Sequence, residues 1–422
     1  MRIAVWHNLP FGGGARALYY HLKGLLEKGH HIEIWSPNPT IDGFFKLPEH
    51  VKIHQVPLKR TQRIPLKDRV KSVFFEKDVN LKEMELHCQQ CADEINSGNF
   101  DVLFANSCFF YAAPFISRYV HIPRVLYLGE PYRYFFEAHP YSFWEAPEVV
   151  NQYSILNKKY WWEWFKDLWK IRAARVQLHE ERINIESVDT LLVNSYFSSD
   201  SCARAYNRMG EVCYLGVDTS TFKPLPDRQT NNYVVGLGSL LFHKNAELAI
   251  KAVAQIKENR PQLVWVSNYK NPEYYNYVLS LAQSLEVDFQ VREMIDDREL
   301  VRLLNNAICM VYTSRLEPFG FAPLEANACM TPVVGLKQGG IRETVIDGKN
   351  GFLCLTEQEI ADKILFLMNN PFERERMGQM AYDNVLLNWT LEEATLRLES
   401  ALSKSIQSGS ELRTGSLTLN AC

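Results

Sequence analysis

Short apolar runs recur along the first half of the chain, separated by helix-like segments. Such an alternation predicts parallel strands that are covered by helices on both faces, and hence a doubly wound α/β domain. A glycine loop and helix are expected at residues 12–28, directly after the first run. The predicted strands are residues 2–6, 31–35, 101–105, 124–128 and 190–194.

The second half starts the same alternation again. A helix is expected at residues 246–256, between the first two strands of this half. Between the halves, residues 216–232 are polar and contain proline, as is typical of a linker. The chain should therefore hold two doubly wound domains. The predicted strands of the second half are residues 233–236, 262–266, 288–291, 308–312 and 332–335.

The end of the chain divides into two parts. Residues 391–402 have amphipathic spacing and predict a helix, whereas residues 407–422 are rich in Ser, Gly and Thr and are expected to be disordered. The expected segments are a first domain, a linker, a second domain, a terminal helix and a tail. Their bounds are residues 1–215, 216–232, 233–388, 389–406 and 407–422.

Composition narrows the class of protein. A chain of 422 residues with 46% hydrophobic and 23% charged residues suits two or three globular domains. The net charge of −3 argues against nucleic-acid binding, which needs a basic excess. The N-terminus enters a strand without a signal-peptide apolar region, and no apolar run is long enough to span a membrane.

The nine cysteines show no disulfide-like framework, so free thiols in a reducing cytoplasm are expected. Cys88 and Cys91 form a CxxC within a helix-like stretch that has no second pair. Helix packing is the favoured interpretation, and metal or redox chemistry is the alternative.

Residues 312–347 carry the main chemical signal. Glu317 and Glu325 are separated by seven residues, and a turn at Gly320 leads from a buried strand into a helix. The amides of Gly320 and Phe321 should point out of the helix start, where the dipole favours an anion. Carboxylates can accept hydrogen bonds from sugar hydroxyls on either side of a phosphate, which indicates a nucleotide-sugar site. The alternative is a glycine turn that serves packing alone.

This stretch resembles the E-x7-E signature of the retaining family 4 glycosyltransferases, and the residues after it resemble the continuation of that signature. The matching residues are Thr331-Pro332-Val333-Val334, Gly339-Gly340, Glu343, Asp347-Gly348 and Asn350-Gly351. The resemblance implies a GT-B fold: two Rossmann-like domains facing across a cleft, with a C-terminal helix crossing back to the first domain. It also implies that residues 1–215 bind the acceptor and residues 233–388 the nucleotide sugar.

The resemblance assigns roles in the second domain. The sequence contains no Asp-x-Asp metal motif, so the protein itself must supply positive charge to the leaving diphosphate. Lys244 is the first candidate, and Ser239 stands where the family usually has an arginine. Glu317 is expected to hold hydroxyls of the transferred sugar and Glu325 those of the ribose. Glu343 is a weaker candidate for contact with the donor or for support of its loop.

The first domain offers fewer candidates. Gly13 and Gly14 lie after the first strand, where the backbone can approach a phosphate or an acceptor closely. Arg16 could reach an anion or lie on the surface. Gly129 replaces a histidine that many family members have, which leaves Glu130 to line the active cleft or to serve structure.

Residues 160–170 contain four tryptophans and are followed by Arg172 and Arg175. Three interpretations stay open for this segment: a helix at the surface of an anionic membrane, a core helix, and an aromatic platform for a sugar acceptor. A basic cluster in the same half comprises Lys59, Arg60, Arg63, Lys67, Arg69 and Lys71.

The leading hypothesis is a retaining, metal-independent hexosyltransferase. It would use a UDP- or GDP-hexose as donor, need no cofactor, and act on a glycan or lipid-linked acceptor. A cytoplasmic location with peripheral membrane contact fits this hypothesis. The alternatives are a nucleotide-sugar epimerase or a phosphorylase on the same fold, and a non-catalytic sugar-nucleotide-binding subunit.

Overall fold

The computed structural model describes residues 1–9, 12–37, 47–58, 66–137 and 158–419, with the backbone alone for residues 66–80, 158–160 and 410–419. The chain forms two compact units. The first comprises Met1–Asn194, Ser199–Cys213 and Thr395–Cys422, and the second comprises Ser195–Ser198 and Tyr214–Ala394.

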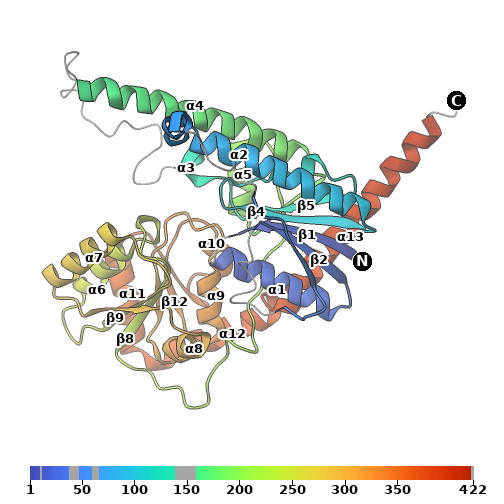
Figure 1. Cartoon of the computed structure of the whole chain (residues 1–422). Coiled ribbons are helices and arrows are strands. Elements are labelled where there is room, and N and C mark those ends of the chain that lie inside the picture. The colour runs from blue at the N-terminus through green and yellow to red at the C-terminus, as the bar shows by residue number, and fades with distance from the viewer. Residues whose placement is uncertain (10–11, 38–46, 59–65, 138–157, 420–422) are drawn as a thin grey trace. The chain divides into compact units, whose positions relative to one another are not determined.

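The first unit is built on a seven-stranded sheet with the order β3-β2-β1-β4-β5-β6-β7, in which every neighbouring pair is parallel. All five strands predicted in this half are present (Figure 1). The strands are β1 (Arg2–Asn8), β2 (His31–Ser36), β3 (Lys52–Gln55), β4 (Val102–Cys108), β5 (Arg124–Tyr127), β6 (Thr190–Val193) and β7 (Glu211–Val212).

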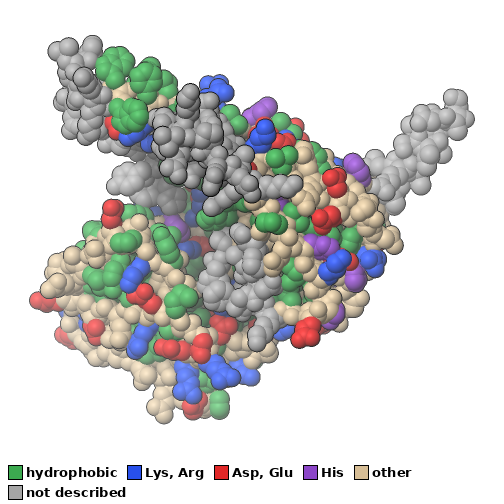
Figure 2. All heavy atoms as spheres, viewed as in Figure 1, with side chains coloured by type: hydrophobic (Ala, Val, Ile, Leu, Met, Phe, Trp, Pro, Cys, Tyr) green, Lys and Arg blue, Asp and Glu red, His purple; other side chains and the backbone are tan. Residues whose placement is uncertain are grey.

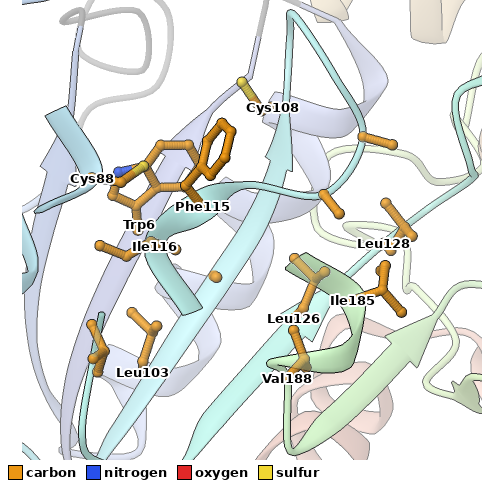
Figure 3. Close-up of a cluster of buried hydrophobic side chains, with 14 of the residues drawn as sticks. Trp6, Cys88, Leu103, Cys108, Phe115, Ile116, Leu126, Leu128, Ile185 and Val188 are labelled. Carbon is orange, nitrogen blue, oxygen red and sulfur yellow. The ribbon is translucent and has the colours of Figure 1, made fainter. Parts of the chain in front are cut away.

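Alternate residues of β1 and β4 build the core on one face of this sheet. Trp6 and Leu103 point to the face on which Cys88 lies, and all three side chains are fully buried (Figure 3). The helices of the unit are α1 (Gly13–Glu27), α2 (Leu66–Ser97), the 3₁₀ turn η1 (Phe115–Arg118), α3 (Arg133–Phe136), α4 (Lys158–Glu186), α5 (Tyr196–Tyr206) and α13 (Leu391–Leu419).

The CxxC cysteines lie inside this core. Cys88 and Cys91 are on α2 and are completely buried. Burial raises the pKa of the Cys91 thiol well above its ordinary value, so the group stays a neutral thiol that packs as a small apolar side chain. The structure therefore favours helix packing for this pair.

The second unit has a six-stranded sheet with the order β10-β9-β8-β11-β12-β13, again wholly parallel. Its strands are β8 (Tyr233–Leu237), β9 (Gln262–Ser267), β10 (Phe289–Glu293), β11 (Met310–Tyr312), β12 (Val333–Leu336) and β13 (Gly351–Cys354). Its helical segments are η3 (Phe242–Lys244), α6 (Ala246–Gln255), α7 (Pro272–Ser284), α8 (Asp297–Asn306), α9 (Phe321–Ala328), α10 (Ile341–Thr344), α11 (Glu357–Asn369) and α12 (Pro371–Asn388).

Both sheets reverse their strand order at one place, which is β1/β4 in the first unit and β8/β11 in the second. At such a switch point the connections leave in opposite directions, and a crevice for ligands opens at the carboxyl ends of the two strands. The predicted class, α/β with two doubly wound Rossmann-like domains, is confirmed. By this general rule, a ligand crevice is expected at β1/β4 in the first unit and at β8/β11 in the second.

The terminal helix was predicted at residues 391–402, and α13 begins at Leu391 and returns to the first unit from Thr395 onward. Leu398 and Leu402 are fully buried there. The backbone of α13 continues to Leu419, into the residues 407–422 for which disorder is expected, and that expectation stays a prediction.

The tryptophans of α4 do not form a core, contrary to one of the interpretations from sequence. Trp162 is 51% exposed, and Trp161 and Trp164 are each 42% exposed.

The basic cluster at residues 59–71 lies outside the described side chains. Within the described part of the chain, no helix is long and apolar enough to cross a bilayer.

Candidate functional site

Lys244 and Glu317 meet at the switch point of the second unit. The Lys244 Nζ atom lies 2.6 Å from Glu317 Oε2, and the two side chains are 20% and 17% exposed. Ser314 donates a hydrogen bond from its Oγ to the same carboxylate oxygen, at 2.9 Å. Lys244 follows β8 and Glu317 follows β11, the two strands between which the sheet reverses. An ammonium and a carboxylate are thus held where a ligand crevice is expected.

Short contacts between the two loops bring this pair together. The hydroxyl of Thr313, directly after β11, donates to the carbonyl oxygens of Asn245 (2.9 Å) and Lys244 (3.2 Å). The Arg315 amide donates to His243 O at 2.7 Å. Asn245 adopts a left-handed conformation with φ of 56°, which asparagine tolerates better than most residues, and this turns the chain from η3 into α6.

Gly238 leaves room for the lysine stem. A Cβ atom added to Gly238 would lie 3.2 Å from Lys244 Cδ and 3.3 Å from Lys244 Cγ, so the aliphatic chain of Lys244 passes directly over this glycine. Ser239, the next residue and a predicted diphosphate contact, is half-buried. Sequence analysis missed Gly238, although a glycine at the end of a strand is the ordinary signal for such a close approach.

Gly339 and Gly340 support Glu317 from behind. The Gly340 amide donates to Glu317 O at 2.7 Å. Gly339 has a φ of 69°, and a Cβ atom on it would lie 2.7 Å from Glu317 N. Both glycines are therefore required by close packing against the turn that carries Glu317.

Helix α9 begins beside this turn. Gly320 precedes it with a φ of 94°, a conformation that favours glycine, and Phe321 is its first residue. The first-turn amides have no carbonyl partner within the helix, so the helix start is suited to a negative charge. Glu325 lies on the same helix and is buried, with 5% of its surface exposed. The structure thus brings Glu317, Lys244 and the start of α9 to one edge, and Glu325 lies on the helix that starts there.

The carboxylate of Glu343 contacts α5 and Tyr214, and not Lys244 or Glu317, among the described residues. Its carboxylate accepts hydrogen bonds from the amides of Tyr196 (2.9 Å) and Phe197 (3.0 Å) and from the hydroxyl of Tyr214 (2.8 Å). The two amides open α5, where a carboxylate complements the helix dipole. Glu343 therefore holds Ser195–Ser198 within the second unit, and its contact with a donor stays a prediction.

The glycine loop of the first unit lies after β1, at the switch point of the first sheet. Gly13 and Gly14 are exposed, and among the described residues nothing lies within 4 Å of a Cβ placed on Gly13. The amide of Arg16 donates to Gly12 O at 3.0 Å in the first turn of α1, and its side chain is half-buried. Among the described residues, packing does not explain the glycine at position 13, and its contact with a ligand stays a prediction.

Glu130 follows β5 and forms an ion pair with Arg133, whose Nε lies 2.5 Å from Glu130 Oε2. Arg133 also pairs with Glu137 at 3.1 Å. The Glu130 side chain is 42% exposed, which leaves it accessible. A Cβ on Gly129 would lie 3.3 Å from Asn194 Nδ2, so Asn194 occupies the space that a larger residue at position 129 would need. The role of Glu130 stays a prediction.

Two further polar residues of the first unit were not singled out from sequence. His7 of β1 and Asn106 of β4 are 2% and 4% exposed, and within the described residues His7 Nδ1 and Asn106 Nδ2 have no hydrogen-bond partner. Burial lowers the pKa of His7 to about 4, so its imidazole is neutral near pH 7. Polar residues that end otherwise apolar strand runs were the signal that could have found them.

Among the described residues, no group of three or more His, Cys, Asp or Glu side chains is arranged to hold a metal ion.

Residues 217–384 match the family model of glycosyl transferases group 1. The matched stretch lies within the second unit and covers most of it. The resemblance predicted from residues 312–347 is confirmed at this level.

A curated relative is similar to less than half of the chain. The chain is 25% identical to alpha-1,3/1,6-mannosyltransferase ALG2 of Mus musculus over 192 residues, which cover 39% of this chain and 46% of that protein. The matched stretches span about half the length of the first curated relatives, from 43% to 57%.

The structural likeness extends over almost the whole chain. Sucrose-phosphate synthase from Thermosynechococcus elongatus superposes with a TM-score of 0.69 at 16% identity, covering 97% of this chain and 100% of that one. Anabaena HepE, solved in complex with UDP and glucose, gives a TM-score of 0.65 at 18% identity and covers 96% of this chain and 99% of that one. At these identities the likeness shows the fold, which is the GT-B fold expected from sequence.

Proposed function

We propose that this protein is a retaining, metal-independent glycosyltransferase that moves a hexose from a nucleoside-diphosphate sugar to a glycan or lipid-linked acceptor. The observation that carries this proposal is the pairing of Lys244 with Glu317 at 2.6 Å, beside the start of α9 at a sheet switch point. The match of residues 217–384 to the family model supports the reaction class.

In this proposal the donor diphosphate rests against the amides that open α9 and against the Lys244 ammonium. Glu317 then accepts hydrogen bonds from hydroxyls of the hexose, and Glu325 from the ribose. A hydrogen bond between a hydroxyl and a desolvated carboxylate contributes roughly 1.5–3 kcal/mol. Gly238, Gly339 and Gly340 keep the two loops close enough for one donor to reach both groups.

The transfer breaks the bond between the anomeric carbon and the diphosphate oxygen. A bond from the acceptor oxygen to the same carbon forms on the same face, so the anomeric configuration is kept. The acceptor hydroxyl gives its proton to the departing phosphate oxygen, and the products are the glycoside and the nucleoside diphosphate. Negative charge grows on the diphosphate in this step, so Lys244 and the α9 dipole stabilise the transition state more than the ground state.

The donor nucleotide and the compartment complete the proposal. UDP is the first nucleotide to test, because the structurally similar HepE was solved with UDP and glucose. A GDP-hexose is the other donor expected from sequence. The eight described cysteines are buried free thiols, which suits a reducing cytoplasm, and no cofactor is required in this scheme.

The deciding experiment is a thermal-shift screen with UDP-, GDP- and ADP-hexoses, followed by NMR assignment of the product anomer. One donor should raise the melting temperature, since a ligand at 100 times its Kd adds about 2.7 kcal/mol to the free energy of unfolding. Transfer should persist in EDTA and keep the donor anomer. An inverted product, or a requirement for a divalent cation, would refute the retaining, metal-independent scheme. Donor binding without transfer, or with epimerisation, would favour the alternatives.

A further inference from the structure

The first half of α4 exposes a cluster of large apolar side chains. Phe165 is 57% exposed, Leu168 is 47% exposed, and Trp161 and Trp164 are 42% exposed. The rings contact one another, with centroids 5.8 Å apart for Trp161 and Trp164 and 5.3 Å apart for Trp164 and Phe165. Hydrophobic side chains gather over this end of α4, at the upper left of Figure 2. Contiguous apolar surface of this kind marks a place of contact with another apolar phase.

Most of the exposed residues of α4 lie in one stripe along the helix, whereas Trp162 and Lys170 are also exposed but lie on other faces. The members of the stripe lie three or four residues apart or next to such a position, so they share one face. The first part of the stripe is apolar, and the second part is basic. Its members are Trp161, Trp164, Phe165, Leu168, Ile171, Arg172, Arg175, His179 and Arg182.

The opposite face of the second half of α4 anchors the helix to the first unit. Asn184 donates from Nδ2 to Ala113 O at 2.8 Å. Glu181 is fully buried and accepts from the Tyr206 hydroxyl at 2.7 Å and from the Ala112 amide at 3.3 Å. Because these bonds fix the rotation of the helix, the stripe is presented outward by the fold.

The charged residues of the stripe as far as Arg182 are basic, and the exposed carboxylate of Glu186 lies on the same face one turn further along, at the end of α4. Arg172, Arg175 and Arg182 are exposed and make no ion pair within the described part of the chain. The carboxylates in the aromatic half, Glu163 and Asp167, lie off the stripe and pair with neighbouring lysines at 2.9 Å and 3.8 Å. An anionic surface would therefore meet three arginines on this face, with the single negative charge of Glu186 at the end of the helix.

We propose that this stripe of α4 binds the surface of an anionic phospholipid bilayer. Indole rings suit the interface between headgroups and acyl chains, since one end is apolar and the other carries an N–H donor. Arginines beyond them suit lipid phosphates, which guanidinium groups bind through paired hydrogen bonds. The contact needs no sugar transfer, so it stands independently of the proposed reaction.

The test is co-sedimentation of the full chain with phosphatidylcholine vesicles, with and without phosphatidylglycerol. The chain should pellet with the anionic vesicles at low salt, remain largely in the supernatant with phosphatidylcholine alone, and be released by added salt. Equal recovery in the supernatant with and without anionic vesicles overturns the proposal.

A triple variant with Trp161→Ser, Trp164→Ser and Phe165→Ser should bind anionic vesicles at least ~10-fold more weakly, since the buried apolar area sets the strength of interfacial binding. The matched control changes Phe372→Ser and Leu387→Ser, which are 79% and 75% exposed on α12 and should leave binding unchanged. Equal losses in both variants would show non-specific binding and overturn the assignment to α4.

A second triple variant, Arg172→Gln, Arg175→Gln and Arg182→Gln, should lose the preference for phosphatidylglycerol. Its control removes exposed positive charge elsewhere, at Lys257 and Arg302. Undiminished preference in the arginine variant overturns the anionic part of the proposal. The membrane proposal is wrong if the chain binds none of the vesicles but elutes as a dimer in size-exclusion chromatography, and the aromatic variant elutes as a monomer. In that case the stripe binds a second copy of the chain.

Discussion

Lys244 Nζ lies 2.6 Å from Glu317 Oε2, which joins the loop after β8 to the loop after β11 by a charged contact. The two residues are 73 positions apart in the sequence and meet because the parallel sheet places their strands side by side. In the proposed reaction the donor diphosphate must draw the ammonium away from this carboxylate, which frees Glu317 for sugar hydroxyls. Donor binding therefore replaces one ion pair by another instead of adding a charge to a bare cation.

Removing either partner should abolish most of the transfer and preserve the fold. For Lys244→Ala and Glu317→Ala we expect kcat to fall by about 10²–10³, the range seen when one preorganised electrostatic contact is removed from an active site. Steady-state kinetics with the donor from the thermal-shift screen would measure this. Lys270→Ala is the matched control, because Lys270 forms a 2.6 Å ion pair with Glu293 in the same unit, and it should retain activity. Normal rates in either site variant would refute the roles given to this pair.

Gly339→Ala should damage the site through the backbone of Glu317. The new methyl group would lie 2.7 Å from Glu317 N at a φ of 69°, and we expect a loss of roughly 1–3 kcal/mol in unfolding free energy together with reduced activity. Gly348→Ala offers a control at a similar φ of 75° with nothing within 4 Å, so it should cost about 1 kcal/mol and leave transfer intact. Urea denaturation would give the unfolding free energy of both variants, and steady-state kinetics would give their transfer rates. Equal transfer rates in the two variants would contradict the steric argument.

Glu343→Ala should lower the free energy of unfolding without lowering the affinity of the protein for the donor. It removes an acceptor from two amides and one hydroxyl, which should cost about 1–3 kcal/mol of unfolding free energy. Urea unfolding would measure this loss, and calorimetric titration with UDP well below the melting temperature would measure donor affinity. A large drop in affinity would instead support the direct donor contact expected from sequence.

Acid should destabilise the first unit through buried histidines. Burial lowers the pKa of His21 to about 4, whereas the unfolded side chain titrates near 6.5. Between these values the side chain is protonated in the unfolded chain and neutral in the folded chain. The contribution of neutral His21 to the free energy of unfolding is therefore complete above pH 6.5 and is lost as the pH falls toward 4. This histidine alone accounts for about 3 kcal/mol.

His21→Phe keeps a ring against Phe104 and Tyr127 and should make the fall of unfolding free energy with acid visibly shallower. Urea unfolding at several pH values between 4 and 7 gives that slope. His50→Leu, at an exposed position, is the control and should follow the parent protein. An unchanged slope in the His21 variant would contradict the account.

The sequence predicted the strands that are long and apolar, because burial on both faces leaves a continuous hydrophobic run. It missed β3 (Lys52–Gln55), whose residues are exposed or half-buried, and β7 (Glu211–Val212), which has only two residues. Such edge strands carry little apolar signal.

For the candidate site, the resemblance of residues 312–347 and of the segment around Lys244 to the family predicted Glu317, Glu325 and Lys244, but the sequence did not reveal the contacts that hold them. Ser314 and Thr313 act through single hydroxyls on loops, and nothing in their neighbours along the chain distinguishes them from solvent-facing residues. The role of Glu343 was hidden as well, because its partners lie 147, 146 and 129 positions away in sequence. The exposure of the α4 tryptophans could not be foreseen either, since aromatic residues at helical spacing suit a core equally well.

The return of α13 to the first unit has a bearing on how the protein is made. Residues from Thr395 onward complete a unit that begins at Met1, and Leu398 and Leu402 fill its interior. During synthesis the apolar surface that Leu398 and Leu402 cover therefore stays exposed to water until these residues have left the ribosome. A chain that stops before Thr395 would leave the unit that is translated first without its last helix.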